Sequence, residues 1–335
     1  MSELQAVSEA ASGMKIPIVD IGPFLAGEPG ALERAAGQVG EASESLGFFF
    51  LCNHGVPQSL IDRTFEQTER FHTLPLERKM EVKVLAHNIG YLPLGGQTQR
   101  SYSLLYGESK YPDRSASFFM RRDYPAGHPD RLARKSWVYD NRWPGDLPGF
   151  RQTLVEYFET LTALSEKVLT LQSVALGLPP DYLPRHEAFS PPVHILRLLH
   201  YPPRDPALDG QFGIGPHTDY GYGSILAQAK VPGLEILTRD GEWIEAPALP
   251  GHLLFNNGDM CQVWTNDRFR SAPHRVINKS GETRYSIPFF VSTRLDVTLA
   301  CLPTCQGPGN PPKYAPISYG EHYARLRQQN FDLPK

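Results

Sequence analysis

Short apolar runs separated by turn residues dominate the chain between residues 193 and 300. They are VHILRLLHYPP, GSILAQA, GLEILTRDGEWIEAP, HLLFNNGDMCQVWTND and HRVINKSGETRYSIPFFV. Runs of this length, with RDGEW and KSGET as turn signals, are typical of strands in a sandwich or jelly-roll barrel. The chain has no strand–helix alternation and no glycine-rich phosphate loop, which disfavours nucleotide-binding α/β folds.

The first quarter of the chain mixes helical and strand patterns. KIPIVDIGPFL predicts a short strand ended by Gly22-Pro23, ALERAAGQVGEASESLG predicts a helix, and GFFFLCNHGVP predicts a second, buried strand. SLIDRTFEQTERFHTLPLERKM predicts two helical pieces divided at Pro75. Residues 87–150 are irregular and rich in Gly, Pro and aromatic residues, which indicates loops that are functional or mobile.

One long amphipathic helix separates these regions. Its apolar stripe is formed by Leu154, Phe158, Leu161, Val168, Leu171 and Ala175, and Gly177 with Pro179 signals its end. We therefore expect a flexible N-terminus at 1–14, an α/β region at 15–150, a scaffold helix at 151–180, a β core at 181–300 and a C-terminal segment at 301–335. The expected fold is mainly β with surrounding helices.

Composition and charge narrow the function classes. The 33 Lys and Arg residues nearly balance the 36 Asp and Glu residues, and no basic run occurs, which makes nucleic acid and anionic membranes poor partners. The N-terminus is acidic and has no apolar core, and no stretch approaches a membrane span, so we expect a cytoplasmic protein. The four cysteines are too sparse for a disulfide scaffold, and we expect free thiols.

Two polar residues precede one of the apolar runs, in GPHTDYGYGSILAQ. Side chains two apart in a strand point to the same face, so His217 and Asp219 can reach one centre, if they are not simply the polar end of a loop. A third ligand must come from another strand, and the best candidate is His274 in SAPHRVIN. A second His-x-Asp, at His128 and Asp130, surrounds a proline in a loop region and is expected to be coincidental.

Two histidines and one carboxylate can form the facial triad of non-haem Fe(II) oxygenases, which leaves positions for a co-substrate and O₂. A hydrolytic zinc site accepts the same ligands, but the chain lacks the HExxH helix that would favour it. Ten residues after His274, Arg284 and Ser286 share one strand face. Because an unpaired buried guanidinium is costly, we expect Arg284 to bind the carboxylate of a small acid.

These segments together resemble the isopenicillin N synthase-like family of Fe(II)/2-oxoglutarate-dependent oxygenases. The resemblance rests on LLHYPP, GPHTDYG, PGLEIL with GEWIEAPALPG, NNGDMCQVWTNDRFRSAPHRV and RYSIPFF, and on IPIVDI and GFFFLCNHGVP near the N-terminus. It implies a distorted double-stranded β-helix, or jelly-roll core, with an N-terminal α/β region packed on it. It also implies that His217, Asp219 and His274 bind iron.

By the same resemblance, Arg284 and Ser286 would bind the distal carboxylate of 2-oxoglutarate, with help from the hydroxyl of Tyr201. The family often has Asn two residues before this tyrosine, whereas this chain has Leu199, so a hydrogen bond from that Asn is absent. The loops around Tyr91, Phe118, Arg121 and Arg122 lie where the family places substrate-facing loops, and these four residues are the predicted substrate pocket.

The activity implied is oxidation of an unactivated C–H bond of a small molecule by O₂, with release of succinate and CO₂. Hydroxylation is the first expectation, while desaturation, ring closure and epoxidation stay open. One alternative is an iron oxidase of the isopenicillin N synthase type, which needs no 2-oxoglutarate. Another is a metal-stabilised protein that binds a small acid without catalysis, which would unfold on loss of the metal.

Overall fold

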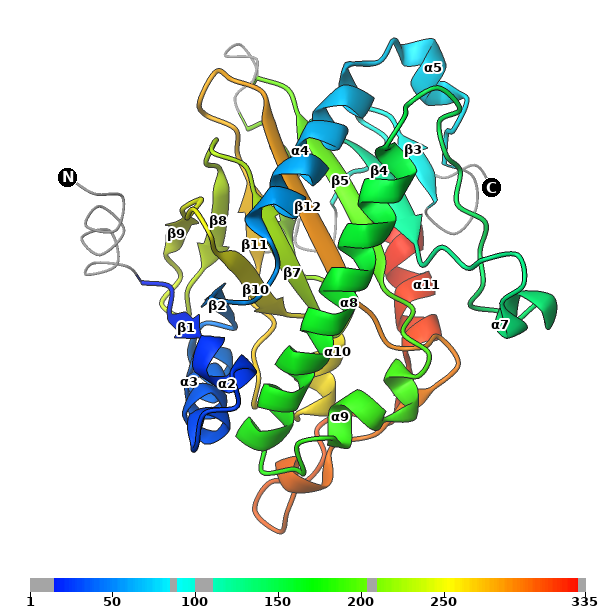
Figure 1. The fold of residues 1–335 in the computed structure, drawn as a ribbon. Helices are drawn as coiled ribbons and strands as arrows, with labels where there is room; N and C mark the ends of the chain where they lie inside the picture. The colour runs from blue at the N-terminus through cyan, green and yellow to red at the C-terminus, as the bar shows by residue number, and fades with distance from the viewer. Residues whose placement is uncertain (1–14, 85–88, 100–110, 204–209, 331–335) are drawn as a thin grey trace.

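The computed structural model describes residues 15–84, 89–99, 111–203 and 210–330, with side chains of the last helix up to residue 324. The flexible N-terminus predicted for residues 1–14 lies outside the described residues. Within these ranges, eight strands form a large sheet and four strands form a smaller sheet that packs against one face of it (Figure 1). The predicted β-rich jelly-roll architecture with surrounding helices is confirmed.

The large sheet has the order β1-β2-β10-β7-β12-β5-β4-β3, and its only parallel pair among the described strands is β1 with β2. Its strands are β1 (Ile18–Asp20), β2 (Phe48–Cys52), β3 (Gly90–Leu92), β4 (Ala116–Arg121), β5 (Ile195–Tyr201), β7 (Gly223–Gln228), β10 (Leu253–Asn257) and β12 (Arg284–Val291). The small sheet has the order β6-β11-β8-β9 and contains β6 (Ile214–His217), β8 (Leu234–Leu237), β9 (Trp243–Ala246) and β11 (His274–Val276). A separate pair joins β13 (Thr298–Leu299) to β14 (Ile317–Ser318).

Helices cover the face of the large sheet that the small sheet leaves free (Figure 1). The longer ones on this face are α3 (Ala31–Ser45), α4 (Gln58–Thr73) and α8 (Phe150–Ala175), whereas α11 (Tyr319–Asn330) follows β14. The shorter ones are α2 (Gly22–Leu25), α5 (Leu76–Met80), α7 (Pro129–Leu132), α9 (Tyr182–Arg185), α10 (Asp259–Trp264), η1 (Glu187–Phe189) and η2 (Pro303–Cys305). Among the described residues, no helix has both the length and the apolar character that crossing a bilayer requires.

Each central strand of the large sheet presents alternate residues to two different cores. In β12, Ile287 and Phe289 pack against the helices, whereas Arg284 and Ser286 face the small sheet. Leu196 and Leu198 of β5 likewise belong to the helix-side core. The period-two geometry of a strand therefore decides which side chains can take part in chemistry between the sheets.

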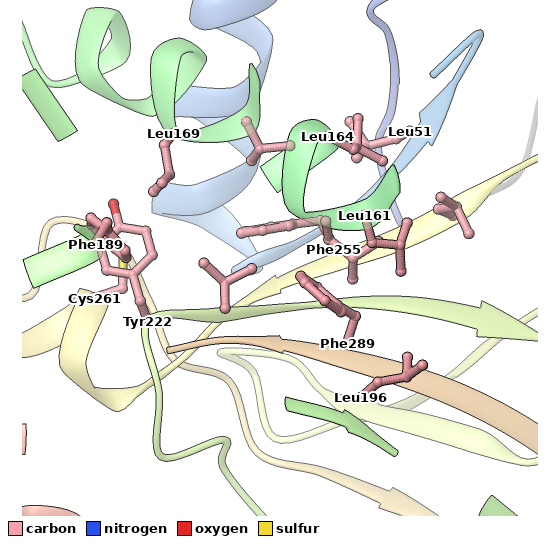
Figure 2. Close-up of a cluster of buried hydrophobic side chains, with 14 of the residues drawn as sticks. Leu51, Leu161, Leu164, Leu169, Phe189, Leu196, Tyr222, Phe255, Cys261 and Phe289 are labelled. Carbon is pink, nitrogen blue, oxygen red and sulfur yellow. The ribbon is translucent and has the colours of Figure 1, made fainter. Parts of the chain in front are cut away.

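The helix-side core is built on α8. Figure 2 shows Leu161 of this helix beside Phe255 of the sheet, and Leu169 nearer to Phe189. Burial of each such side chain contributes about 1.5–3 kcal/mol to stability. The predicted scaffold helix over 151–180 is present as α8, and Gly177, with φ of 74°, follows its end in the left-handed conformation.

The first quarter of the chain is part of the same sheet as the rest. β2 pairs with β10, and the connection from α3 runs through Gly47, where a Cβ would lie 2.2 Å from the carbonyl oxygen of Arg270. β4, in a stretch expected to be irregular loop, pairs along its whole length with β5. The expectation of loops there is therefore wrong for residues 116–121, since this apolar run is buried on both faces and completes the sheet.

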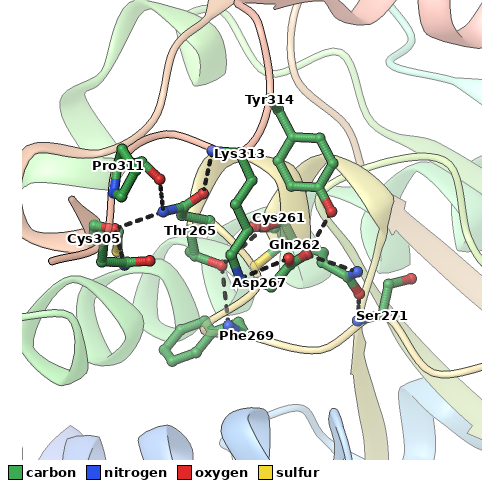
Figure 3. Close-up of polar contacts among 12 residues, drawn as sticks. Cys261, Gln262, Thr265, Asp267, Phe269, Ser271, Cys305, Pro311, Lys313 and Tyr314 are labelled. Carbon is green, nitrogen blue, oxygen red and sulfur yellow. Dashed lines mark hydrogen bonds and ion pairs between the residues drawn. The ribbon is translucent and has the colours of Figure 1, made fainter.

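The segment after β13 is fastened to the loop that follows α10 (Figure 3). Asn266 donates to the carbonyl oxygens of Cys305 and Pro311 and accepts the backbone N–H of Lys313. Asp267 accepts hydrogen bonds from the Lys313 ammonium and the Tyr314 hydroxyl. These bonds hold the 301–314 segment against the core before the chain enters α11.

Candidate metal centre

The three side chains predicted as metal ligands lie together between the two sheets. His217 is the last residue of β6, His274 is the first residue of β11, and Asp219 follows two residues after β6. One ligand atom from each residue lies within 4.8 Å of the other two. The prediction that His217 and Asp219 share a strand face is wrong in one respect, because the strand ends at His217 and Asp219 reaches the centre from the loop.

Both histidines are held by backbone carbonyl groups. Nδ1 of His217 lies 2.9 Å from the oxygen of Gly215, and Nδ1 of His274 lies 3.1 Å from the oxygen of Ala272. A carbonyl accepts hydrogen bonds only, so each Nδ1 carries the proton and each Nε2 presents a lone pair. Burial and the neighbouring His274 lower the pKa of His217 to about 3, which keeps its ring neutral and able to bind a metal.

Asp219 completes the cluster with one carboxylate oxygen. Its Oδ1 lies 3.8 Å from Nε2 of His274 and 4.0 Å from Nε2 of His217. Its Oδ2 accepts hydrogen bonds from Ser224 at 2.5 Å and from Asn256 at 2.8 Å. Burial alone would raise the pKa of Asp219, but the two histidines and these hydrogen bonds outweigh it and lower the pKa.

This donor set fits a divalent transition metal. Two Nε2 atoms and one carboxylate oxygen converge, while the second polar atom of each side chain is already hydrogen-bonded. Two imidazoles and a carboxylate grouped in this way are typical of non-haem Fe(II) centres. Within the described part of the chain, no other Cys, Asp or Glu joins the cluster, so coordination positions are left for small molecules.

The predicted carboxylate-binding residues form a second polar group between the sheets. Arg284 of β12 pairs in register with Tyr201 of β5, and its guanidinium carbon lies 4.8 Å from the centre of the tyrosine ring. Ser286 lies 3.4 Å from the Tyr201 hydroxyl. Only Nη2 of Arg284 has a partner among the described residues, Gln228 at 3.2 Å, whereas Nε and Nη1 have none.

Arg284 is 1% exposed, and its Nε and Nη1 reach no carboxylate in the described ranges. Burial lowers the pKa of Arg284, although a guanidinium stays charged at neutral pH. Two unpaired N–H donors on a buried cation are expensive unless an anion reaches them. The arrangement therefore fits a small carboxylate that binds from the space between the sheets.

That space has two connected parts. The inner chamber is lined by Phe48, Leu199, Tyr201, Asn256, Arg284 and Ser286, and the outer chamber is lined by Gln97, Gln99, Phe119, Ile195, Tyr220 and Tyr319. Arg197, His217, Asp219 and Phe290 line both parts. The candidate metal ligands thus stand at the junction, with Arg284 in the inner chamber. A ligand in the outer chamber can approach the metal from the opposite side.

The structure does not bring the predicted substrate residues together. Phe118 packs against Phe71 on the helix side of the sheet, with ring centres 4.9 Å apart, and Tyr91 also packs on Phe71. Arg122 pairs with Glu159 of α8 at 3.0 Å. These three predictions are therefore wrong, because the side chains lie on the far side of the sheet from the chambers.

Arg121, the fourth predicted substrate residue, lines a hollow that adjoins the outer chamber and shares Ile195, Tyr319 and Tyr323 with it.

The second His-x-Asp pattern is structural, because Nδ1 of His128 accepts the backbone N–H of Asp130 and caps α7.

Sequence reasoning missed Phe119 and Arg197, which line the outer chamber. Phe119 is the neighbour of the predicted Phe118 and points to the other face. Arg197 lies four residues before Tyr201 on the same face of β5, so the period-two rule could have found it once Tyr201 was placed between the sheets.

Comparisons with known proteins decide the family. The model of the 2OG-Fe(II) oxygenase superfamily matches residues 192–293, and that of the non-haem dioxygenase in morphine synthesis N-terminal region matches residues 16–146. The chain is 35% identical to the 2-oxoglutarate-Fe(II) type oxidoreductase hxnY of Emericella nidulans, over 94% of this chain and 90% of that protein. The chain belongs to the 2OG-Fe(II) oxygenase superfamily.

Other members of the superfamily agree with this assignment. The chain is 30% identical to a homoarginine-6-hydroxylase of Oryza sativa, over 94% of this chain and 97% of that protein. A full-length Neurospora crassa protein solved in complex with alpha-KG superposes with a TM-score of 0.81 at 28% identity, over 94% of this chain and 96% of that chain. This oxygenase therefore uses Fe(II) and 2-oxoglutarate, and the predicted enzyme class and cofactors are confirmed.

Proposed function

We propose that His217, Asp219 and His274 hold Fe(II) and that Arg284, Ser286 and Tyr201 hold 2-oxoglutarate, so that the enzyme hydroxylates a small organic molecule. One observation carries this assignment. The buried guanidinium of Arg284 has two N–H donors without partners among the described residues, in the same inner chamber that the three metal-ligand candidates face. 2-Oxoglutarate is a dicarboxylate that can reach both groups.

Each residue has a distinct task in this proposal. Arg284 pairs with the distal carboxylate through its free N–H groups, and the hydroxyls of Ser286 and Tyr201 donate to the same carboxylate. Fe(II) with bound 2-oxoglutarate and O₂ supplies the oxidising chemistry, which yields succinate, CO₂ and oxidised product. The strands fix the positions of the reacting groups before the substrate arrives, which lowers the entropic cost of the reaction.

The two histidines and Asp219 are also sheltered from water. All three are less than a tenth exposed, and Phe48 packs edge-on against His274 with ring centres 5.3 Å apart. Ser224 and Asn256 hold the second oxygen of Asp219, so one oxygen is left to bind the metal. Burial of this kind protects a reactive centre from side reactions with solvent.

Two relatives support a small-molecule substrate, and the name of one of them supports hydroxylation. The rice relative is named a homoarginine-6-hydroxylase, and the Neurospora crassa protein has also been solved with alpha-KG and thymine. The outer chamber, which is in contact with the candidate ligands His217 and Asp219, is the site we assign to the substrate.

Anaerobic titration with Fe(II) and then 2-oxoglutarate tests the proposal. We expect the weak visible charge-transfer band of chelated 2-oxoglutarate in the wild type, and no band in a folded His217→Ala variant. Admission of O₂ should then produce succinate from the wild type alone. A folded wild type that gives neither the band nor succinate would refute the proposal.

A further inference from the structure

A second buried arginine, Arg197 of β5, stands between the metal-ligand candidates and the outer chamber. It is 6% exposed and lines both chambers, together with His217 and Asp219. Nη2 of Arg197 donates to Oε1 of Gln97 at 2.8 Å, while Nε has no hydrogen-bond partner among the described residues. Its guanidinium therefore has donor capacity that the described side chains do not fill.

The surroundings of Arg197 hold its guanidinium in place. The guanidinium carbon lies 4.6 Å from the centre of the Phe119 ring, close enough for a cation–π contact. Gln97 holds Nη2 from another segment of the chain. A guanidinium with one face on an aromatic ring offers its edge to a planar acceptor.

The charges around Arg197 and its unfilled N–H donor indicate the kind of acceptor. In the proposed complex, the charges of Fe(II) and Arg284 are balanced by Asp219 and the two carboxylates of 2-oxoglutarate. Arg197 adds one positive charge. The buried Asp113 acts on this charge electrostatically, as Asp219 does, but no direct ion pair joins Arg197 to either carboxylate within the described ranges. A substrate carboxylate could form that direct pair and satisfy the Nε–H of Arg197, which has no partner among the described residues.

The other residues that line the outer chamber indicate the polarity of the rest of the substrate. Phe119, Ile195 and Phe290 are apolar and lie beside the arginine, whereas Gln97 and Gln99 add amide groups. Apolar and aromatic walls with few polar groups are typical of sites that enclose a compact organic body and fix its orientation.

We propose that Arg197 binds the carboxylate of the oxidised substrate, so that this enzyme acts on small monocarboxylic acids with an apolar body. This inference rests on the proposed function, because it assigns the inner chamber and Arg284 to 2-oxoglutarate. Arg197 is then a specificity-determining residue that holds the acid end of the substrate while the rest of the molecule lies near the metal.

Matched acids and amides test the inference. The probes are benzoate, phenylacetate and 1-naphthoate, each paired with its primary amide, at pH 7.5. Their binding is measured by calorimetry on the full chain with Mn(II) in place of Fe(II) and saturating 2-oxoglutarate, so that no turnover occurs. We expect at least one acid to bind about tenfold or more tightly than its amide, as a charge-assisted pair predicts. The same acid should stimulate succinate formation by the Fe(II) enzyme.

Three variants assign the effect to Arg197. Arg197→Met should remove the preference for the acid and leave 2-oxoglutarate affinity unchanged, and Arg197→Lys should restore part of the preference. Arg122→Met is the matched control, because this arginine pairs with Glu159 on the far side of the sheet, and it should keep the wild-type preference. If Arg197→Met does not fold, Arg197→Lys and Arg197→Gln provide the comparison.

Several results would overturn the inference. They are equal binding of acids and amides by the wild type, no acid bound at millimolar concentration, or an acid preference that Arg197→Met retains. A loss of 2-oxoglutarate affinity in Arg197→Met would assign the arginine to the co-substrate instead. A wild type that binds no 2-oxoglutarate at all refutes the proposed function, which is a separate outcome from the loss of acid preference alone.

Discussion

His217 and His274 are opposed residues of neighbouring antiparallel strands, and their ring centres are 4.3 Å apart. The pairing of β6 with β11 therefore sets the separation of the two imidazoles before any metal binds. With both Nδ1 atoms held by backbone carbonyls, the rings have little freedom left to lose on coordination.

Removal of one of these rings should weaken metal binding without unfolding the protein. We expect His217→Ala to bind far less Fe(II) than the wild type by metal analysis, with thermal unfolding close to that of the metal-free wild type. His128→Ala is the matched control, because it removes the histidine of the other His-x-Asp pattern, and it should keep full metal content. Unfolding of His217→Ala or of the metal-free wild type at room temperature would instead favour a metal-stabilised scaffold.

The hydrogen-bond donors to Asp219 should affect metal affinity nearly as much as the ligands themselves do. Asn256→Ala and Ser224→Ala each remove one donor to Oδ2, and we expect metal affinity to fall by about 10–100-fold in each variant. Titration with Mn(II) measures this change. Asn257→Ala is the control, since Asn257 pairs with Gln172 of α8; it should lose stability and keep metal affinity. Unchanged affinity in Asn256→Ala would contradict the prediction.

Replacement of Arg284 should have opposite effects on the free and liganded protein. Without 2-oxoglutarate, Arg284→Met should be more stable than the wild type by about 1 kcal/mol or more, because an unpaired buried charge is replaced by an apolar side chain of similar length. At a 2-oxoglutarate concentration of about 100 times Kd, the wild type should gain about 2.7 kcal/mol and the variant nothing. Thermal unfolding with and without the ligand measures both effects. A variant that retains the ligand-induced gain would rule out this role of Arg284.

Acid should destabilise the protein through buried neutral histidines. Burial, with a smaller contribution from Arg122, lowers the pKa of His194 to about 3, whereas an unfolded histidine titrates near pH 6.5. Between these values the unfolded state binds the extra proton, so stability falls as the pH falls, by up to about 1.4 kcal/mol per pH unit for this residue.

His194→Asn tests this source of acid sensitivity, because the amide oxygen can still accept the backbone N–H of Ser292. Its stability should depend less steeply on pH between 6 and 4 than that of the wild type, as measured by denaturant unfolding at several pH values. Equal slopes in the wild type and His194→Asn would count against the assignment.

The sequence predicts most of this architecture because its strands alternate clearly where one face carries polar groups. Arg284 and Ser286 were expected on one face of a strand and are found there, next to Tyr201. β4 is different, because all six of its residues are buried and the pattern does not distinguish its faces. A choice of Phe118 over Phe119 therefore depended on chance, and only the pairing of β4 with β5 decides it.

For Asp219 the opposite holds. The predicted course of the backbone was wrong in one detail, although the residue does lie beside the two histidines as expected. The spacing from His217 predicted a shared strand face, while the chain leaves the strand at His217 and turns. The donors that hold Asp219, Ser224 and Asn256, lie 5 and 37 residues further along the chain. No local sequence pattern predicts such hydrogen-bond donors, since they come together only when β7 and β10 pair in the sheet.

Phe48 makes the first quarter of the chain inseparable from the metal centre. It lies on β2, lines the inner chamber and packs on the ring of His274, while β2 completes the hydrogen bonding of β10. A protein engineer who exchanges the N-terminal segment for that of a relative would therefore also exchange a wall of the reaction chamber. The N-terminal segment therefore helps to shape the chamber as well as to complete the sheet.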